Sequence, residues 1–445
     1  MTSLARKPLG LLCLAAAVAL AGCTGAPGFS ADAAATAVAA TVAAMAAPTV
    51  TVAPPSTAEE HTLPTDAPTA IAPELVVAYT DGGNVAFLAG AGPASHLTAG
   101  GGIEQVRLSD DGRRIAYTRR AVLDQPVELR AVNSDGSGDA LLMSPADFDA
   151  LYPLAGALHH DLYKFEFIPG THTLLINTRS IFEGPGLATH DDLLRIDSDT
   201  LARTMLLAPA TGGDFTISPD GRYLALVRPD TIEIRLADGS PSGSGVITYE
   251  PVITYSEYAY YAQPVWNPAS TMIGVAIPSA DPLAPATSGT IWRLPVGASA
   301  SLVGTISGAF FFPSFNAPLL SPDLSQVAYT RPTSAPNVSN LYRASADGSG
   351  ETLAATYSQW NGWSPDSSHF VFSSGDALNL QLGDLAGGLA PLVSGTDLRW
   401  FSPGAFVYLS GSMGAWTLQR GGLGAPSTPL ASPGGDFIDY AFAYR

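Results

Sequence analysis

Short apolar runs separated by turn residues fill the chain from about Pro73 onward, and one arrangement recurs. An apolar run ends in Ser-Pro-Asp-Gly or a variant, and a second apolar run follows, as at Ile217–Gly221 before Leu224–Leu226. Proline presets φ for a turn, aspartate accepts from the backbone two residues on, and glycine tolerates positive φ. The pattern predicts a β-hairpin. Related hairpins are predicted at Leu108–Thr118, Phe167–Ile176, Trp266–Val275, Leu320–Thr330, Trp363–Phe372 and Phe401–Tyr408.

A second hairpin follows each first one, most clearly where the turn reads Asp-Gly-Ser-Gly, at Asp135–Gly138 and Asp347–Gly350. Two hairpins give four strands per repeat. Eight repeats over residues 73–445 average about 47 residues each, which lies within the usual span of propeller blades. Looser copies of the second hairpin are Val85–Leu97, Leu193–Leu207, Ile232–Ile247, Ile291–Val303, Leu378–Val393 and Trp416–Leu430.

The first repeat lacks an inner strand, because it begins with its second strand, Leu75–Thr80. The missing strand is available at Phe437–Tyr444, and pairing of the two would close a ring without an open sheet edge. We therefore expect an all-β fold, a β-propeller of eight four-stranded blades closed by the C-terminal strand. Seven blades are the alternative, and an open β-solenoid is the structural rival. Small residues in the middle of the return strands suggest that one face presses against a neighbouring sheet: Ala116, Ala225, Gly274 and Ala328.

The N-terminus is typical of an exported lipoprotein. Arg6 and Lys7 precede an apolar run, Leu9–Leu20, that is too short to span a bilayer comfortably. The run ends in Leu20-Ala21-Gly22-Cys23, which resembles a lipobox, so residues 1–22 are predicted to be a signal peptide and Cys23 the lipidated residue. A plain secretory signal or membrane anchor is the alternative. Residues 23–72 are rich in Ala, Thr and Pro and are predicted to be a tether, followed by the propeller at 73–445.

The composition of the chain argues against several classes of function. The formal net charge is −18, and such acidity argues against a nucleic-acid partner. Cys13 lies in the predicted signal peptide and Cys23 would carry lipid, so no disulfide, thiol chemistry or cysteine-bound metal is expected in the folded part. We expect a monomer without a cofactor, attached to the cell membrane or outer membrane through the lipid and located outside the cytoplasm.

The repeats resemble the TolB-type propeller repeat, which also occurs in the propellers of the prolyl oligopeptidase and dipeptidyl peptidase IV families. The resemblance covers about 73–445 and rests on Ser218–Ala225, Ser321–Asp323, Trp363–Asp366 and the two Asp-Gly-Ser-Gly turns. It implies the fold and is almost silent on function. The hydrolase domain of the peptidases has no counterpart here, and no Gly-x-Ser-x-Gly elbow occurs. Peptidase activity therefore does not carry over.

Three groups of residues could form a binding site on the face opposite the Ser-Pro-Asp turns. Arginines at the ends of return strands could clamp a carboxylate or phosphate, or could instead bridge blades: Arg119, Arg120, Arg179, Arg228 and Arg331. Aromatic residues in the connections between blades could recognise a protein or sugar, or could pack between blades: Tyr255, Tyr258, Tyr260, Tyr261 and Trp360. Weak metal candidates in two loops leading into strands are His159, His160, Asp161, His190 and Asp191, although no known metal spacing is present.

The expected function is therefore that of a tethered, non-enzymatic binding or scaffold module for an envelope protein or glycan. No catalytic residues and no bound metal are expected. The alternative is an extracytoplasmic hydrolase or lyase, directed at glycans or peptides, that uses the same loop-rich face.

Overall fold

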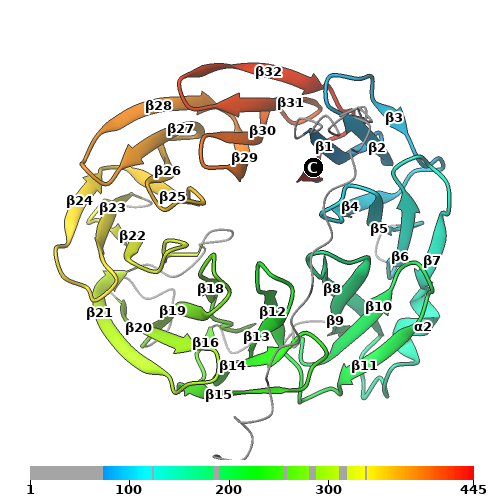
Figure 1. Cartoon of the computed structure of the whole chain (residues 1–445), viewed down its shortest axis with the longest axis horizontal. Helices are drawn as coiled ribbons and strands as arrows, with labels where there is room; N and C mark the ends of the chain where they lie inside the picture. Colours follow the sequence, from blue (N-terminus) through cyan, green and yellow to red (C-terminus); the bar gives the residue numbers. More distant parts are fainter. Residues whose placement is uncertain are drawn as a thin grey trace, which may run out of the picture. The chain divides into compact units, whose positions relative to one another are not determined.

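The computed structural model describes residues 74–122, 125–183, 190–254, 258–279, 287–309, 318–335 and 338–445. These ranges form eight antiparallel sheets, the blades, arranged as a ring (Figure 1). Within them, blade 6 has three strands and each other blade has four. No helix of the described ranges is long and apolar enough to cross a bilayer.

The strands of the first four blades are given in order from the inside of the ring outward. Blade 1 contains β33 (Tyr440–Tyr444), β1 (Leu75–Asp81), β2 (Asn84–Ala89) and β3 (Ser95–His96). Blade 2 contains β4 (Ile103–Leu108), β5 (Arg114–Arg119), β6 (Glu128–Asn133) and β7 (Ala140–Met143). Blade 3 contains β8 (His159–Phe167), β9 (Thr173–Ile181), β10 (Leu193–Asp197) and β11 (Arg203–Leu207). Blade 4 contains β12 (Asp214–Ile217), β13 (Tyr223–Val227), β14 (Thr231–Leu236) and β15 (Pro241–Thr248).

The other four blades follow the same order. Blade 5 contains β18 (Val265–Trp266), β19 (Met272–Pro278), β20 (Thr287–Pro295) and β21 (Ser301–Ala309). Blade 6 contains β22 (Gln326–Pro332), β23 (Ser339–Ser345) and β24 (Thr352–Ala355). Blade 7 contains β25 (Ser358–Trp363), β26 (His369–Ser374), β27 (Asp376–Asp384) and β28 (Leu389–Ser394). Blade 8 contains β29 (Thr396–Ser402), β30 (Ala405–Ser412), β31 (Ala415–Gly422) and β32 (Ala425–Ala431).

Two short elements lie in connections between blades. Helix α2 (Pro145–Asp149) follows blade 2, and its first turn is closed by a capping box between Ser144 and Asp147. The hairpin of β16 (Ile253–Thr254) and β17 (Tyr258–Ala259) follows blade 4.

The C-terminal strand closes the ring as predicted. β33 pairs antiparallel with β1, from Leu75 opposite Tyr444 to Tyr79 opposite Tyr440. The prediction of eight blades is confirmed, and the seven-bladed and open-solenoid alternatives are excluded.

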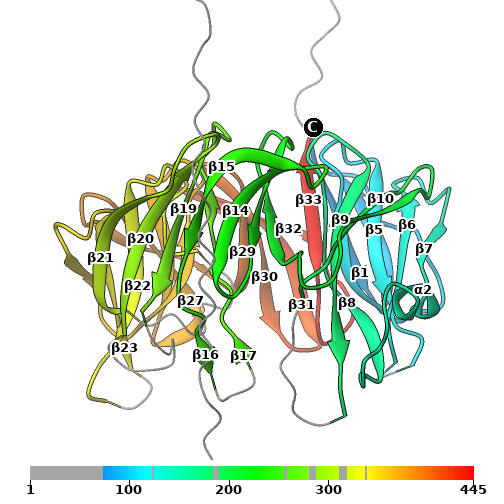
Figure 2. The same ribbon diagram turned by 90° about the horizontal axis from the view of Figure 1, so that it is seen from below.

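The Ser-Pro-Asp turns define two faces of the ring. In four of these turns the serine hydroxyl donates to the aspartate Oδ1 at 2.6 Å and accepts the amide five residues on at 2.9 Å. We call the end of the ring that carries these turns the turn face. The opposite end, where each blade passes to the next, is the connection face, and the β16–β17 hairpin projects from it, away from the C-terminus (Figure 2).

The small residues of the return strands lie where neighbouring blades pack together, as predicted. Ala116 of blade 2 belongs to an apolar cluster with Phe165 and Leu174 of blade 3. A Cβ on Gly274 of blade 5 would lie 2.9 Å from a methyl carbon of Leu324, in the turn that leads into β22. Larger side chains at these positions would push the sheets apart.

Asp439 ties three blades together at the closure. Its Oδ2 accepts from the Val106 amide at 2.9 Å and from Arg107 at 3.0 Å, both in blade 2. Its Oδ1 accepts from Arg399 of blade 8 at 3.2 Å, and its own amide donates to Thr80 of blade 1 at 3.0 Å. A single carboxylate thus joins the first and last blades to the second.

We expect Asp439→Ala to lower the free energy of unfolding by about 2–4 kcal/mol, because it leaves the buried Val106 amide without an acceptor and removes one carboxylate contact from each of two guanidinium groups. Urea unfolding monitored by tryptophan fluorescence measures this change. The matched control is Asp436→Ala, since the Asp436 carboxylate is exposed. Equal losses in the two variants would contradict the role assigned to Asp439.

Candidate functional site

Three aromatic rings from separate segments stack near the connection-face end of blade 3. The register of β8 against β9 shifts between Leu162 and Lys164, so Tyr163 is the extra residue of a β-bulge. Its ring stacks on His190 with centroids 4.0 Å apart and planes 10° apart. On His190 the ring of Tyr261 packs at 3.8 Å. We call these three residues the aromatic stack. Tyr163 is 39% exposed, so the stack is open to solvent at this residue.

His190 is the buried centre of the stack. It is 6% exposed, and burial lowers the pKa of its imidazole from 6.5 to about 4, with the charges of Lys164 and Arg179 adding to the effect and Asp214 opposing it. Its Nε2 is buried without a hydrogen-bond partner. At neutral pH the ring is therefore uncharged and has one unused nitrogen.

Arg179 lies on the same tyrosine. Its guanidinium carbon is 5.9 Å from the centroid of the Tyr163 ring, and its Nε is buried without a partner. Asn177, two residues earlier on β9, has a buried Oδ1 without a partner, while its Nδ2 donates to the Gly213 carbonyl at 3.1 Å. Eight buried side-chain polar atoms lack partners in the described ranges, and three of them belong to Asn177, Arg179 and His190. Unsatisfied buried groups concentrate at this site.

Two carboxylates near the stack, in contrast, have partners. Asp214 accepts from Lys164 at 3.3 Å, and Lys164 also pairs with Glu166 at 3.5 Å. Asp192 is fully buried and accepts from the amide and hydroxyl of Thr178, both at 2.7 Å. Burial raises the pKa of Asp192 to about 6, although its hydrogen bonds to Thr178 act in the opposite direction. The buried side-chain atoms without a partner at this site thus belong to the guanidinium, the imidazole and the amide.

Three of the five predicted arginines have partners in the chain. Arg120 pairs with Glu104 at 2.7 Å and with Asp161 of the next blade at 3.6 Å. Arg228 contacts Glu233 and donates to the Gly212 carbonyl at 3.1 Å. Arg331 pairs with Glu351 at 2.7 Å and donates to the Ser307 carbonyl of blade 5 at 2.6 Å.

The other two arginines are partnerless in the described ranges. Arg119 is the last residue of β5 in blade 2, and Arg179 lies two residues before the end of β9 in blade 3. The Nε of each is buried without a hydrogen bond. Only Arg179 of the two has a ring contact among the described residues.

The predicted aromatic residues do not form one surface. Tyr260 is half-buried and packs against two apolar clusters, one involving blades 4 and 5 and one involving blades 5 and 6, whereas Tyr261 joins the stack. Trp360 donates to the Pro318 carbonyl at 3.3 Å and packs edge-on against Trp363. Tyr255 and the side chain of Tyr258 lie outside the described residues.

The prediction that His159, His160 and Asp161 lie in a loop is wrong, because all three belong to β8. The strand extends further because its residues pair with β9 as far as Ile181. His160 contacts Ser180 at 3.1 Å and the Tyr152 carbonyl at 3.3 Å, and Asp161 accepts the amides of Val127 and Leu162. Across the described ranges no three His, Cys, Asp or Glu side chains converge as metal ligands, and this applies to the candidates His190 and Asp191 as well.

Tyr163 was not predicted as a site residue. A signal was present in the sequence, since Leu162 and Phe165, both buried, are three residues apart and so break the alternation of the strand. Such a break is what a bulge produces.

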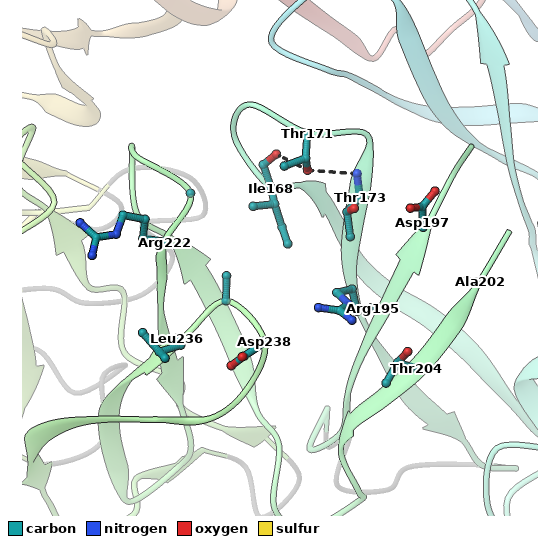
Figure 3. Close-up of a pocket in the computed structure, with 12 residues that line it drawn as sticks. Ile168, Thr171, Thr173, Arg195, Asp197, Ala202, Thr204, Arg222, Leu236 and Asp238 are labelled. Carbon is teal, nitrogen blue, oxygen red and sulfur yellow. Dashed lines mark hydrogen bonds between the residues drawn. The ribbon is translucent and has the colours of Figure 1, made fainter. Parts of the chain in front are cut away.

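A groove of about 530 Å³ lies between blades 3 and 4 on the turn-face side and was also not predicted (Figure 3). Arg195 and Arg222 line it together with Asp197 and Asp238. Hydrogen bonds from Ser240 lower the pKa of Asp238, with a smaller contribution from Arg195. The charges in the groove balance, and Figure 3 shows Arg222 extending away from the other side chains. This groove is therefore a weaker candidate than the aromatic stack.

Comparison with known proteins shows similarity of fold. No family profile and no curated protein matches the sequence. The propeller domain of the Trilobed protease from Pyrococcus furiosus is 12% identical, with 74% of this chain and 98% of that chain covered and a TM-score of 0.43. The putative TolB from Agrobacterium tumefaciens is 15% identical (57% and 98% covered, TM-score 0.32). Porphyromonas gingivalis dipeptidyl peptidase 4 is 14% identical (74% and 53% covered, TM-score 0.43).

The buried groups of the site should give the stability of the protein a characteristic dependence on pH. Because the pKa of His190 is lower in the folded chain, acidification from about 6.5 to below 4 should reduce the free energy of unfolding, by up to about 3 kcal/mol. His190→Gln should remove this loss. The pKa of Asp192 is raised instead, so its contribution is present at low pH and is lost as the pH rises through about 6. Asp192→Asn should therefore make the free energy of unfolding rise more steeply with pH, whereas His190→Gln should make it rise less steeply.

Urea unfolding of the wild type and both variants at a series of pH values between 4 and 7 measures these slopes. If the wild type and His190→Gln lose stability in parallel on acidification, His190 is not held uncharged by burial.

Proposed function

We propose that this protein is a non-enzymatic binding module that engages a protein partner through the connection face at blade 3. The observation that carries the proposal is the aromatic stack, which is open at Tyr163 and flanked by a guanidinium without a partner. Tyrosine and arginine are the residue types most often responsible for affinity at protein interfaces. A rigid sheet holds both of them, so little conformational entropy is lost on binding.

The distribution of exposed apolar side chains supports the same face. In the described ranges, seven large apolar residues that are exposed lie in connection-face loops or hairpins: Val122, Leu158, Phe182, Ile253, Tyr357, Met413 and Phe437. Loops of the turn face carry two, Leu201 and Leu385. Exposed aliphatic and phenyl groups favour a protein partner over a glycan, because sugars need polar groups beside the ring faces that they contact.

The carboxylates near the stack support binding rather than hydrolase or lyase chemistry. A general acid or base must reach the substrate, yet Asp192 is fully buried and committed to Thr178. Asp214 is held by Lys164.

We further propose that Cys23 is lipidated and that the propeller is tethered outside the cytoplasm. Glu74, the first described residue, pairs with Arg445 at the turn face; the Arg445 amide donates to the Glu74 carbonyl at 3.0 Å.

Affinity capture from native envelope with the full chain, followed by mass spectrometry, tests the proposed function. Tyr163→Ala should reduce recovery of the specific partner at least tenfold, because it removes the open ring of the stack. Tyr444→Ala is the matched control, since Tyr444 is 47% exposed on the last strand at the turn face, and it should leave recovery unchanged. Equal recovery with wild type and Tyr163→Ala would contradict the proposal. Recovery of a glycan alone would show that the partner is a glycan and not a protein.

A further inference from the structure

We propose that Arg179 and His190 form a subsite for a carboxylate, which an aspartate or glutamate side chain of the partner protein supplies. This inference deepens the proposed function and rests on it, because it assigns a chemical group to the same surface.

The state of Arg179 is unusual for this chain. Acidic residues outnumber Lys and Arg by 39 to 21, so a guanidinium has many possible partners. Arg120, Arg228 and Arg331, at or next to the ends of second strands, all contact carboxylates. The side chain of Arg179 makes no hydrogen bond or ion pair with any described residue, and its Nε is buried. Burial of an unsatisfied charged donor costs free energy, and a ligand that accepts from it would recover that cost.

The imidazole and the guanidinium both contact the ring of Tyr163. The Tyr163 ring has His190 stacked at 4.0 Å and the Arg179 guanidinium carbon at 5.9 Å from its centroid. A neutral imidazole carries one N–H, and the His190 Nε2 is buried and unused. The guanidinium offers a planar fork of donors that matches the two oxygens of a carboxylate. The subsite that we infer requires both nitrogen groups to donate to one oxyanion at the Tyr163 ring.

The surrounding charge favours a monoanion. Asp214 and Glu166 lie close by, where they pair with Lys164 at 3.3 and 3.5 Å. A phosphate dianion would feel about twice the repulsion from them that a carboxylate feels.

The apolar neighbours favour a peptide over an acidic sugar. His159 pairs with Ile181 at the ends of β8 and β9, so Leu158 and Phe182 follow as cross-strand neighbours, and both are exposed. An acidic side chain flanked by apolar residues in a peptide would meet this combination of groups.

Arg119 provides a matched comparison for Arg179. It is the last residue of β5 in the neighbouring blade 2 and has the same buried, partnerless Nε, although its place in the strand corresponds to that of Thr178. No ring contact is found for it in the described ranges, and no imidazole lies beside it there. If partnerless arginines in general bound carboxylates, Arg119 and Arg179 would behave alike.

Saturation-transfer NMR with the full chain tests the subsite. The probes are N-acetyl-glutamate N-methylamide, its glutamine counterpart and glucuronate. We expect the glutamate probe to bind at least fivefold more tightly than the glutamine probe and more tightly than glucuronate. Arg179→Gln should weaken binding of the glutamate probe at least tenfold, whereas Arg119→Gln should leave it unchanged. Thermal unfolding midpoints within about 2 °C of the wild type show that the variants are folded.

Several outcomes would overturn the subsite. These are equal binding of the glutamate and glutamine probes, equal effects of Arg179→Gln and Arg119→Gln, or tighter binding of glucuronate, which would assign the site to acidic sugars. Failure of the proposed function looks different. In that case Tyr163→Ala leaves envelope capture intact while the glutamate probe still binds in an Arg179-dependent manner. Tyr163-dependent capture without probe binding overturns the subsite alone.

Discussion

The burial of both faces of every blade is the constraint on which this structure depends. The strands alternate between side chains that pack against the preceding blade and side chains that pack against the following one, so a blade with one free face would expose an apolar surface. A row of such sheets leaves no apolar face exposed to water only if the last blade packs against the first. The chain meets this requirement with β33, which completes blade 1, and with Asp439, which joins blades 1, 2 and 8 through two arginines and a backbone amide. Its small return-strand residues, such as Gly274, set how closely the blades approach.

The fold could be predicted because its determinants are local. The turn Ser218–Gly221 carries its own hydrogen bonds, from the serine hydroxyl to the aspartate at 2.6 Å and from the Arg222 amide to the same aspartate. Even where glycine is replaced, the fourth residue keeps positive φ, as Leu324 (62°) and Ser367 (62°) do. Repetition of such a signal gives blade number, and the absence of one inner strand gives the closure.

The site could be predicted only in part, because it depends on contacts between distant segments. Arg179, His190 and Tyr261 were each candidates, yet the sequence places them in different repeats or loops and does not indicate that they meet. Tyr163 is directed to them by a bulge whose register shift depends on the pairing of β8 with β9. The arginines posed the same difficulty. All of them lie near the ends of return strands, and only the presence or absence of a nearby carboxylate separates a bridge between blades from a free guanidinium.

The position of Glu74 has a mechanical consequence. The first described residue pairs with Arg445 at the turn face and leads directly into β1, which lies between β33 and β2 in its sheet. Tension applied to the chain that precedes Glu74 would act along the axis of β1, parallel to the strands on both sides. Such a load shears many hydrogen bonds together instead of opening them one at a time. The ring would therefore resist extraction of its first strand when a partner bound on the connection face is pulled away.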